Sequence, residues 1–426
     1  MTYFTMNRFL QILYSVSFIF LFIGINNVAF SEIDIKENAG SLSKNSQFDS
    51  AHIDEAIMMS AGYLKKNCDI NGKFTYRVNI DPAVKFLPKY NILRHAGAIY
   101  ALATYEQRTK DKEVLDTLKH AVRFLKKNSI KALSERDDML AVWSSPEINL
   151  SKGPYQAKLG GAGLGLVALL SMEKIKQGTT SIDVLRKIGR FILFMQKSDG
   201  SFYSKFIPSR GGRNDQWTSL YYPGEAALGL LMLYEKDPHP EWLQGAAESI
   251  AYLARIREGR DIVEADHWAL IATARLLPLY NRCRQPIPRK RLLQHALQIC
   301  KSMLIDIPEC SKEPNICGSL SRGGTTCPTA TRLEGLLAAL TFLPDEQRVF
   351  RRKIKSIVSN GISFLLRSQV SSGKYVGGIP RAIGKLPSIH PSYSEKFNKR
   401  ATEIRIDYVQ HALNAMIQYS EFFEMH

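Results

Sequence analysis

The chain has 426 residues, of which 45% are hydrophobic and 23% are charged, and its formal net charge is +17. This composition excludes a disordered or low-complexity chain, and the length suffices for one large domain or for two or three smaller ones. A charge of this size favours anionic partners, and no segment after residue 31 is long and apolar enough to span a membrane.

The first 31 residues predict a secretory signal peptide. Arg8 precedes an apolar run over residues 12–25, and Ala-Phe-Ser at residues 29–31 reads as a small-x-small cleavage signal. An uncleaved membrane anchor is the alternative, because only one positive charge precedes the apolar run. We therefore expect a periplasmic or secreted protein, membrane-anchored if the signal is retained, with a linker over residues 32–50.

The positive charge bears on the partner of the exported chain. The predicted signal peptide contains a single basic residue, so its removal leaves the charge almost unchanged. For an exported protein, an acidic polysaccharide or an anionic envelope surface fits this charge better than nucleic acid does. The alternative is that the charge serves solubility. Beyond the signal peptide or anchor, no membrane contact is expected.

Hydrophobic periodicity predicts helices throughout the chain from residue 51 onward, with almost no alternation of the kind that marks strands. One kind of helix is amphipathic with Lys and Arg along one side, as in residues 113–128, and needs a wet face. The other kind is apolar nearly all round and rich in Gly and Ala, as in residues 159–172, and needs to be enclosed. The expected helices cover residues 51–67, 92–106, 113–127, 158–173, 182–196, 223–236, 240–255, 267–280, 289–304, 329–342, 348–369 and 406–424.

The two kinds of helix alternate in six pairs, which predicts an all-α (α/α)6 toroid with six inner and six outer helices. A recurring turn supports the repeat: NCDINGKF at 67–74, QKSDGSF at 196–202 and QVSSGKY at 369–375. These turns and the starts of the apolar helices resemble those of the six-hairpin (α/α)6 toroid superfamily. That superfamily includes glycosidases, polysaccharide lyases, sugar epimerases, terpene cyclases and lanthionine cyclases. The resemblance covers residues 51–426 as one domain and leaves the activity open, because members differ in chemistry.

The inner helices of a toroid run in one direction, so their N-termini meet at one mouth. Polar and aromatic residues gather at these six starts, whereas the later turns of the same helices carry almost none. Helix capping accounts for the Asp, Thr and Glu residues but not for the cations, which oppose the helix dipole. The residues are Asn91, Arg94, His95, Lys158, Tyr221, Tyr222, Glu225, Asp266, His267, Trp268, Thr329, Thr331, Arg332, Glu334, Arg405, Asp407, Tyr408, Gln410 and His411.

Two interpretations of this gathering remain open. The arginines and carboxylates form either a buried ring of ion pairs that closes the barrel, or a cleft for a polar and anionic saccharide. In the cleft, arginines would bind carboxylate or sulfate groups and aromatic rings would stack on sugars. The candidate substrate-binding residues are Arg94, His95, Lys158, Tyr221, His267, Trp268, Arg332, Arg381, Arg405 and Tyr408.

Hydrolysis of a glycosidic bond is the first catalytic hypothesis, acting on an acidic or envelope-derived saccharide. It requires two carboxyl groups, one protonated as the acid and one ionised as base or nucleophile. Glu225 and Asp407 are the preferred pair, with Asp266 and Glu334 as the other candidates. Aromatic neighbours would raise the pKa of Glu225, and Arg405 would keep Asp407 ionised.

The alternative catalytic hypothesis is a uronate epimerase or a polysaccharide lyase. Such enzymes remove the proton beside a carboxylate, so they need a Tyr or His base and a cation that neutralises the carboxylate. The candidate bases are Tyr222, Tyr408, His95, His267 and His411, with Arg94, Arg332 and Arg405 as the cations. A third hypothesis is a saccharide-binding or polysaccharide-assembly protein with no catalysis.

The sequence predicts no cofactor and no metal site. It contains no Gly-rich phosphate loop, and the run Gly160–Gly165 is interpreted as close packing within an inner helix. The DxDD motif of protonating terpene cyclases and the Cys, Cys, His set of zinc lanthionine cyclases are both missing from the sequence.

Six cysteines fit an exported protein with disulfides, whose pairing the sequence leaves open. Cys310, Cys317 and Cys327 lie in one Pro/Gly-rich loop, shortly after Cys283 and Cys300. A zinc site is the alternative, although the chain has no CxxC pair and no His at ligand spacing.

Residues 374–405 form a long loop, rich in Pro, Gly and basic residues, before the last inner helix. Loops of this length are often functional. We therefore expect this loop to lie across the mouth with Arg381 and His390 facing the ligand. Disorder of the loop is the alternative.

Overall fold

The computed structural model describes residues 49–134 and 136–424, which belong to one compact unit. The predicted signal peptide, and the predicted linker over 32–50 apart from its last two residues, lie outside the described residues. Within the described part of the chain, no helix combines the length and apolarity needed to cross a membrane.

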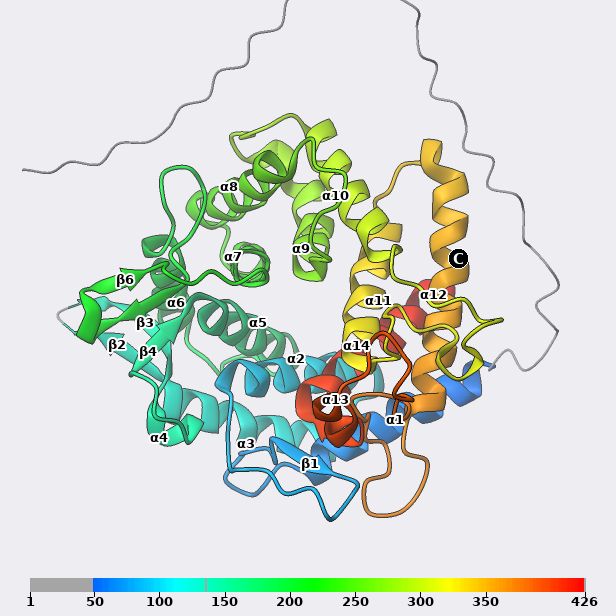
Figure 1. The fold of residues 1–426 in the computed structure, drawn as a ribbon. Coiled ribbons are helices and arrows are strands. Elements are labelled where there is room, and N and C mark those ends of the chain that lie inside the picture. The colour runs from blue at the N-terminus through cyan, green and yellow to red at the C-terminus, as the bar shows by residue number, and fades with distance from the viewer. Residues whose placement is uncertain (1–48, 135, 425–426) are drawn as a thin grey trace, which may run out of the picture. The chain divides into compact units, whose positions relative to one another are not determined.

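Twelve helices form two concentric rings, as Figure 1 shows. Each inner helix packs against two inner neighbours, and the ring closes where α14 meets α2. The predicted (α/α)6 toroid is therefore confirmed. The inner helices are α2 (Ile92–Thr109), α5 (Leu159–Ile175), α7 (Tyr222–Lys236), α9 (His267–Leu276), α11 (Thr326–Leu340) and α14 (Ile406–Glu424). The outer helices are α1 (Ser50–Lys66), α3 (Lys112–Ser129), α6 (Ile182–Phe194), α8 (Pro240–Arg257), α10 (Arg289–Met303) and α12 (Arg348–Ser368).

The predicted difference between inner and outer helices is also confirmed. In the inner helix α5, every residue from Leu159 to Glu173 is buried. In the outer helix α6, only one apolar stripe, which includes Leu185 and Ile188, is buried, and the Ser181 side chain caps its first turn. The apolar residues of both rings form one continuous core.

Glycines in α5 allow it to pack very close to α7. A Cβ atom on Gly163 would lie 2.6 Å from the backbone carbonyl carbon of Glu225, and one on Gly160 would lie 2.1 Å from the Glu225 carboxylate. Backbone cannot move aside as a side chain can. The interpretation of Gly160–Gly165 as a packing surface is therefore correct.

Replacing Gly163 with alanine is expected to destabilise the fold by about 1–3 kcal/mol, because α5 and α7 must separate to admit the methyl group. Intrinsic helix propensity alone would give the opposite sign, a gain of about 1 kcal/mol. Gly62→Ala in α1 is the matched control, since a Cβ there meets nothing within 4 Å. Urea unfolding of both variants measures the difference. If both variants were stabilised equally, α5 and α7 would separate without a cost in the free energy of unfolding.

The expectation of almost no strands is wrong. A five-stranded antiparallel sheet lies beside α6 (Figure 1), and a two-stranded pair joins β1 to β7. Most of these strands have three or four residues, too few for alternation to be visible, and tertiary pairing creates them. The strands are β1 (Arg77–Asn79), β2 (Ile130–Leu133), β3 (Arg136–Ser144), β4 (Gln156–Lys158), β5 (Lys205–Ile207), β6 (Gly212–Asn214) and β7 (Glu403–Arg405).

The strands have a positional role at the N-terminal ends of the inner helices. β4 runs directly into α5, and β7 runs directly into α14. Pairing of β7 with β1 and of β4 with β5 thereby fixes where these two helices begin. Two short helices, α4 (Pro146–Asn149) and α13 (Glu395–Arg400), complete the ordered segments together with four short 3-10 turns.

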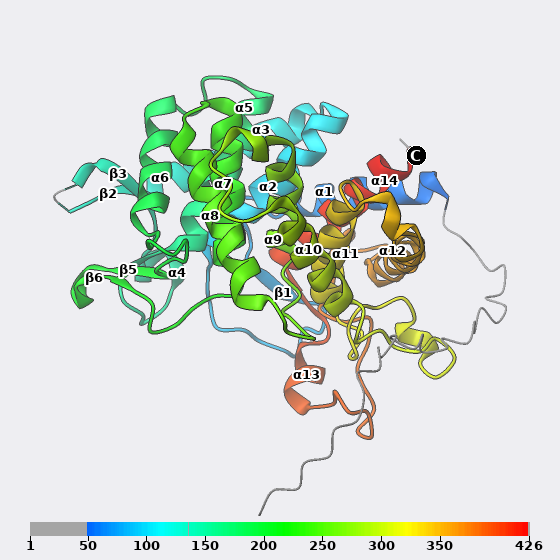
Figure 2. The same cartoon turned by 90° about the horizontal axis from the view of Figure 1, so that it is seen from above.

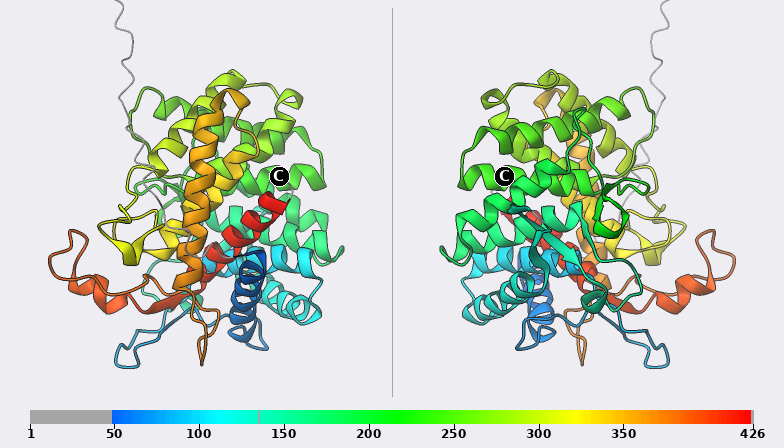
Figure 3. Two further views of the ribbon diagram at one scale, coloured as in Figure 1. Left: turned by 90° about the vertical axis from the view of Figure 1, so that its right-hand side faces the viewer. Right: turned by 90° about the vertical axis from the view of Figure 1, so that its left-hand side faces the viewer.

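The long loop before α14 is ordered and has a small core of its own. Ala382, Leu386, Phe397 and Ala401 pack together, and Asn398 exchanges two 2.8 Å hydrogen bonds with the Leu386 backbone. Figure 2 shows α13 and β1 at the same end of the ring, and Figure 3 shows the α13 segment projecting from it. The loop therefore lies at the predicted end of the toroid.

One of the predicted disulfides is present, between Cys310 and Cys317. The other four cysteines, Cys68, Cys283, Cys300 and Cys327, are free. Among the described residues, no cluster of three candidate metal ligands includes a cysteine, so nothing there supports the alternative of a cysteine zinc site.

Candidate functional site

A small pocket of about 160 Å³ lies at the N-terminal ends of the inner helices, and we call it the mouth pocket. Four of the six inner helices, α2, α9, α11 and α14, contribute to it, together with Tyr221 immediately before α7. Most of its lining belongs to the residue set predicted from the helix starts. The lining residues are Arg94, Tyr221, Ala265, His267, Trp268, Cys327, Pro328, Thr331, Arg332, Arg405, Asp407 and His411.

Asp407 is the centre of an ion-pair cluster in the mouth pocket. Both of its carboxylate oxygens bond to Arg405, at 2.5 and 2.6 Å, and Nε of Arg94 lies 3.3 Å from Oδ2. Burial opposes ionisation of this carboxyl group, but the two arginines outweigh burial and hold its pKa below the usual value. Asp407 is thus ionised, as predicted, but its oxygens are occupied by arginines.

Glu225 is protonated at neutral pH, because burial raises its pKa to about 8. Its Oε2 atom is buried without a hydrogen-bond partner among the described residues. The side chain packs between Gly160 and Tyr222 at the α5–α7 contact, and it does not line the mouth pocket. The predicted acid therefore has the expected protonation state but is enclosed by helix packing.

The buried proton on Glu225 should make stability depend on pH. The unfolded chain loses this proton above about pH 4.5, whereas the folded chain keeps it to about pH 8. The folded state therefore binds the extra proton within this window, and stability should fall as pH rises, by at most about 1.4 kcal/mol per unit. Glu225→Gln should remove that slope and be more stable than wild type at pH 8. The exposed Glu241→Gln is the control, and urea unfolding at pH 5 and pH 8 is the measurement. If the stability of Glu225→Gln depended on pH as steeply as that of wild type, the buried proton on Glu225 would not be the cause of that dependence.

His411 and Glu334 form a buried pair at the floor of the mouth pocket. Their atoms Nδ1 and Oε1 lie 2.6 Å apart, and Asn414 donates to the other carboxylate oxygen at 3.5 Å. Burial raises the pKa of Glu334 above its usual value, and the bonds to His411 and Asn414 offset only part of that rise. A carboxylate that accepts from Nδ1–H leaves Nε2 of His411 as a proton acceptor. This is the arrangement of an oriented general base.

His267 has two ring nitrogens that are buried and have no hydrogen-bond partner among the described residues. Burial lowers its pKa well below the ordinary value, and the neighbouring His411 and Arg94 lower it further. The ring is therefore neutral, and it packs against Trp268 and the ring of Tyr221. Leaving a buried polar group unpaired costs about 1–3 kcal/mol, so His267 is suited to a ligand that supplies the missing bond.

One donor atom from each of His267, Glu334 and His411 lies within 4.8 Å of the other two. The sequence predicts no metal, yet a set of two histidines and a carboxylate is one that divalent transition metals accept. Three guanidinium groups and one carboxylate line the same pocket as the two histidines, and this excess of positive charge opposes a dication and favours an anion. The mouth pocket is therefore better suited to an anionic ligand than to a metal ion.

Four of the other predicted residues are held by helix caps and packing. Asp266 caps α9 through the Ala269 amide and bonds to the buried Arg257 at 2.9 Å. His95 is fully buried between the Tyr90 hydroxyl and the Ala121 carbonyl. Lys158 precedes α5 and Tyr222 packs on Gly160, and neither lines the mouth pocket.

The loop residues also lie outside the pocket lining. Arg381 stacks over Phe397, and His390 bonds to Glu313 beside the disulfide. Tyr408 lies under the Arg405 guanidinium, where it supports a pocket residue.

Cys327 lines the mouth pocket and was not among the predicted site residues. The predicted helix begins at residue 329, but α11 begins at Thr326, so Cys327 occupies its first turn. Burial raises the pKa of the thiol to about 12, which makes it a neutral part of the wall.

Comparisons with known proteins identify the fold. No family model and no curated protein matches the chain. Among solved structures, it is similar to the GH76A α-1,6-mannanase from Salegentibacter sp. HEL1_6, with 13% identity, a TM-score of 0.58, and coverage of 87% of this chain and 99% of that one. It is similar to cellobiose 2-epimerase from Bacillus thermoamylovorans B4167, with 13% identity, a TM-score of 0.61, and coverage of 88% and 100%. It is also similar to a D-mannose isomerase, with 11% identity, a TM-score of 0.58, and coverage of 89% and 100%. At these identities the likeness shows the toroid fold.

Proposed function

We propose that this protein is a carbohydrate-active enzyme of the proton-transfer class, an epimerase, isomerase or lyase. It would hold one anionic sugar unit in the mouth pocket and move the proton beside the carboxylate or carbonyl group. The solved structures with this fold include two sugar-converting enzymes, which is consistent with such chemistry.

The composition of the mouth pocket supports this proposal over hydrolysis. Hydrolysis needs one protonated and one ionised carboxyl group on either side of the sugar. Asp407 is the one carboxylate among the lining residues described, and its oxygens are engaged by Arg94 and Arg405. Glu225, which has the protonation state of an acid, does not line the pocket.

The arginines provide a place for a negative charge on the sugar. Asp407 holds the guanidinium groups of Arg94 and Arg405 in position. Nη1 of Arg332 is buried without a hydrogen-bond partner among the described residues. A substrate carboxylate would supply that partner, and the same cations would stabilise the enolate that forms when the proton leaves.

The histidines provide the proton transfer. Nε2 of His411 would accept the proton from carbon, while the electron pair of the C–H bond moves onto the substrate oxygen beside the arginines. His267 lies next to His411, with ring centroids 5.4 Å apart. In an epimerase, one ring nitrogen of His267 would give its proton to the carbon while the other takes up the proton from His411, so that His267 is neutral before and after the step. Glu334 would act as a positioning residue that holds the His411 ring.

The size of the mouth pocket limits the substrate. Its volume of about 160 Å³ is well below the range of about 300–1,000 Å³ that is common for drug-sized ligands. We therefore propose a monosaccharide or the end of a chain as the substrate, with Trp268 and Tyr221 against the sugar ring.

Incubation with sugars in D2O tests the proposed function. Uronic acids, neutral monosaccharides and short oligosaccharides are offered, and NMR follows deuterium incorporation, new epimers and unsaturated products. Deuterium on the carbon beside the carboxylate or carbonyl is expected. Release of reducing ends without deuterium exchange would establish hydrolysis instead. Activity that is lost to a chelator and restored by a divalent ion would show that the histidines bind a metal.

We also propose that the protein is exported. Export is supported by the signal-like sequence of residues 1–31 and by the Cys310–Cys317 disulfide, which suits an oxidising compartment. Fractionation of cells that produce the full chain, with detection of cleavage near residue 31, tests it. Retention of the whole chain in the cytosol would contradict it.

A further inference from the structure

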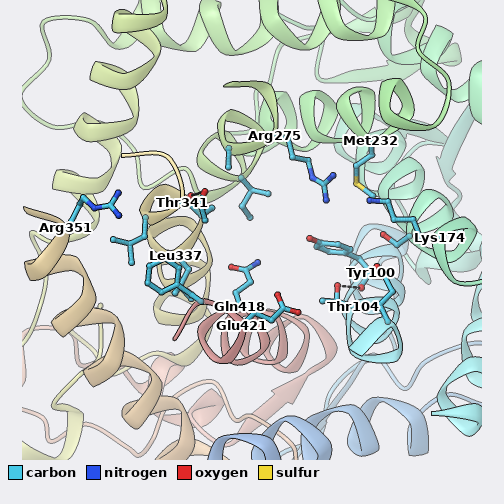
Figure 4. A pocket seen from close by; sticks show the side chains of 17 residues that line it. Tyr100, Thr104, Lys174, Met232, Arg275, Leu337, Thr341, Arg351, Gln418 and Glu421 are labelled. Carbon is cyan, nitrogen blue, oxygen red and sulfur yellow. Dashed lines mark hydrogen bonds between the residues drawn. The ribbon is translucent and has the colours of Figure 1, made fainter. Parts of the chain in front are cut away.

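A second and larger cavity lies at the opposite end of the toroid, among the C-terminal halves of the inner helices. Its volume is about 600 Å³, and all six inner helices contribute to its wall, as Figure 4 shows. We call it the far cavity. No step of the proposed reaction uses it, and its volume lies within the range of small-molecule sites.

Three polar groups of the far cavity have no partner within the described residues. Oε1 of Gln418 is buried and unsatisfied. Tyr100 is half-buried and Glu421 is exposed, and neither the Tyr100 hydroxyl nor the Glu421 carboxylate takes part in the hydrogen bonds or ion pairs found there. Gln418 and Glu421 come from α14, and Tyr100 comes from α2 beside it. Figure 4 shows the three side chains around one hollow.

Two of the three cations of the far cavity share one carboxylate. Arg275 bonds to Glu235 at 2.7 Å, and Nζ of Lys174 lies 3.4 Å from the same carboxylate. Arg351 donates to the backbone carbonyl of Leu343. Glu235 and the lining residue Glu421 offset two of the three positive charges, so the net charge around the far cavity is small and an anionic ligand has little advantage in it.

The combination of these groups suits the surface of a neutral sugar. A carboxylate accepts hydrogen bonds from two adjacent hydroxyl groups, an amide both donates and accepts, and a phenol does likewise. Met232, Ile271, Leu337 and Leu340 supply an apolar wall for the C–H face of the ring. Ligand sites commonly combine a mainly apolar wall with a few convergent polar groups in this way.

The two sites meet along the axis of the toroid. Tyr100 lines the far cavity and Trp268 lines the mouth pocket, and their ring centroids lie 6.5 Å apart. The two sites therefore approach each other at these two rings.

We propose that the far cavity is a second saccharide site that takes a neutral sugar, held by Glu421, Gln418 and Tyr100. This site is separate from the arginine-lined mouth pocket. The proposal of a second site holds whether or not the mouth pocket carries out the proposed reaction.

Calorimetric titration of the full-length protein with cellobiose, maltose and α-1,6-mannobiose, and with glucuronic acid as the anionic probe, tests the proposal. At least one neutral disaccharide is expected to bind. Glu421→Gln and Tyr100→Phe should each weaken that binding at least tenfold, because each removes a bond to a sugar hydroxyl. Glu424→Gln is the matched control, since Glu424 pairs with Arg108 and Ser420 and does not line the cavity. It should bind as wild type does.

A mouth variant, His411→Asn, separates the two sites. It should bind the neutral disaccharide with wild-type affinity. The proposal is overturned if no neutral disaccharide binds, if Glu421→Gln and Tyr100→Phe bind as tightly as wild type, or if His411→Asn alone abolishes binding. Thermal unfolding of every variant establishes that the fold is intact, and Gln418→Glu provides a second test should Tyr100→Phe unfold.

Discussion

Replacing His411 with asparagine is expected to lower the rate of proton exchange into the substrate by about 100-fold to 10,000-fold, the range for loss of a general base. The fold should persist, because asparagine can still bond to Glu334 from the same position on α14. Deuterium incorporation in D2O measures the rate, and thermal unfolding checks the fold.

Two further variants define what His411 does. Glu334→Gln should keep part of the activity but shift the pH profile, because the neutral glutamine can still accept from Nδ1–H but no longer stabilises the positive charge of the protonated ring. The exposed His239→Asn should have wild-type activity. Full activity in His411→Asn would show that another residue acts as the base, and His267 would then be the next candidate.

Replacing Asp407 with asparagine is expected to destabilise the protein by about 2–4 kcal/mol. The substitution keeps the shape of the side chain but leaves the guanidinium groups of Arg94 and Arg405 without a counter-charge. Breaking a buried ion pair commonly costs about 3–5 kcal/mol. The expected loss is somewhat smaller, because the two arginines are 30% and 22% exposed.

The loss of stability in Asp407→Asn should be smaller at low pH than at neutral pH. The arginines hold the pKa of Asp407 below its ordinary value of 3.8, so its stabilising effect is present above that pH. The effect should disappear as pH falls through the lower folded pKa, and the difference between wild type and Asp407→Asn should shrink below about pH 4. Urea unfolding at pH 7 and below pH 4 measures it.

An exposed ion pair supplies the comparison for Asp407. Asp116 lies 2.6 Å from Lys119 on the outer helix α3, and its side chain is 67% exposed. Asp116→Asn should therefore leave stability almost unchanged. Equal effects of Asp116→Asn and Asp407→Asn would show that the cluster around Asp407 is as well solvated as the surface.

The ring of inner and outer helices could be predicted because each helix carries its own pattern of apolar residues. A helix that must be enclosed is apolar nearly all round, as α5 is, and one that faces water has a single apolar stripe, as α6 has. Strands such as β4 and β7 were missed because three residues contain almost no periodicity, and distant partners create them. The small core around Phe397 was missed for a similar reason, since its members are spaced along an irregular loop.

The set of residues at the mouth could be predicted from the sequence once the helices were assigned, because parallel inner helices bring their N-terminal ends together. The sequence could not predict which of those residues are free to bind or react. Arg94 and Asp407 come from opposite ends of the chain, and their contact decides that Asp407 holds arginines. Glu225 and His411 stand at similar places on their helices, yet helix packing encloses one and the other lines the pocket.

The sequence by itself determined the repeating toroid and the end of it that carries the polar groups, because hydrophobic periodicity and helix direction are properties of neighbouring residues. Only the tertiary structure decided which side chains pair, which are buried without partners and how large each cavity is. Hydrogen bonds, desolvation and volume depend on atoms contributed by helices far apart in the chain, and these interactions set the charge and freedom of every group at the site.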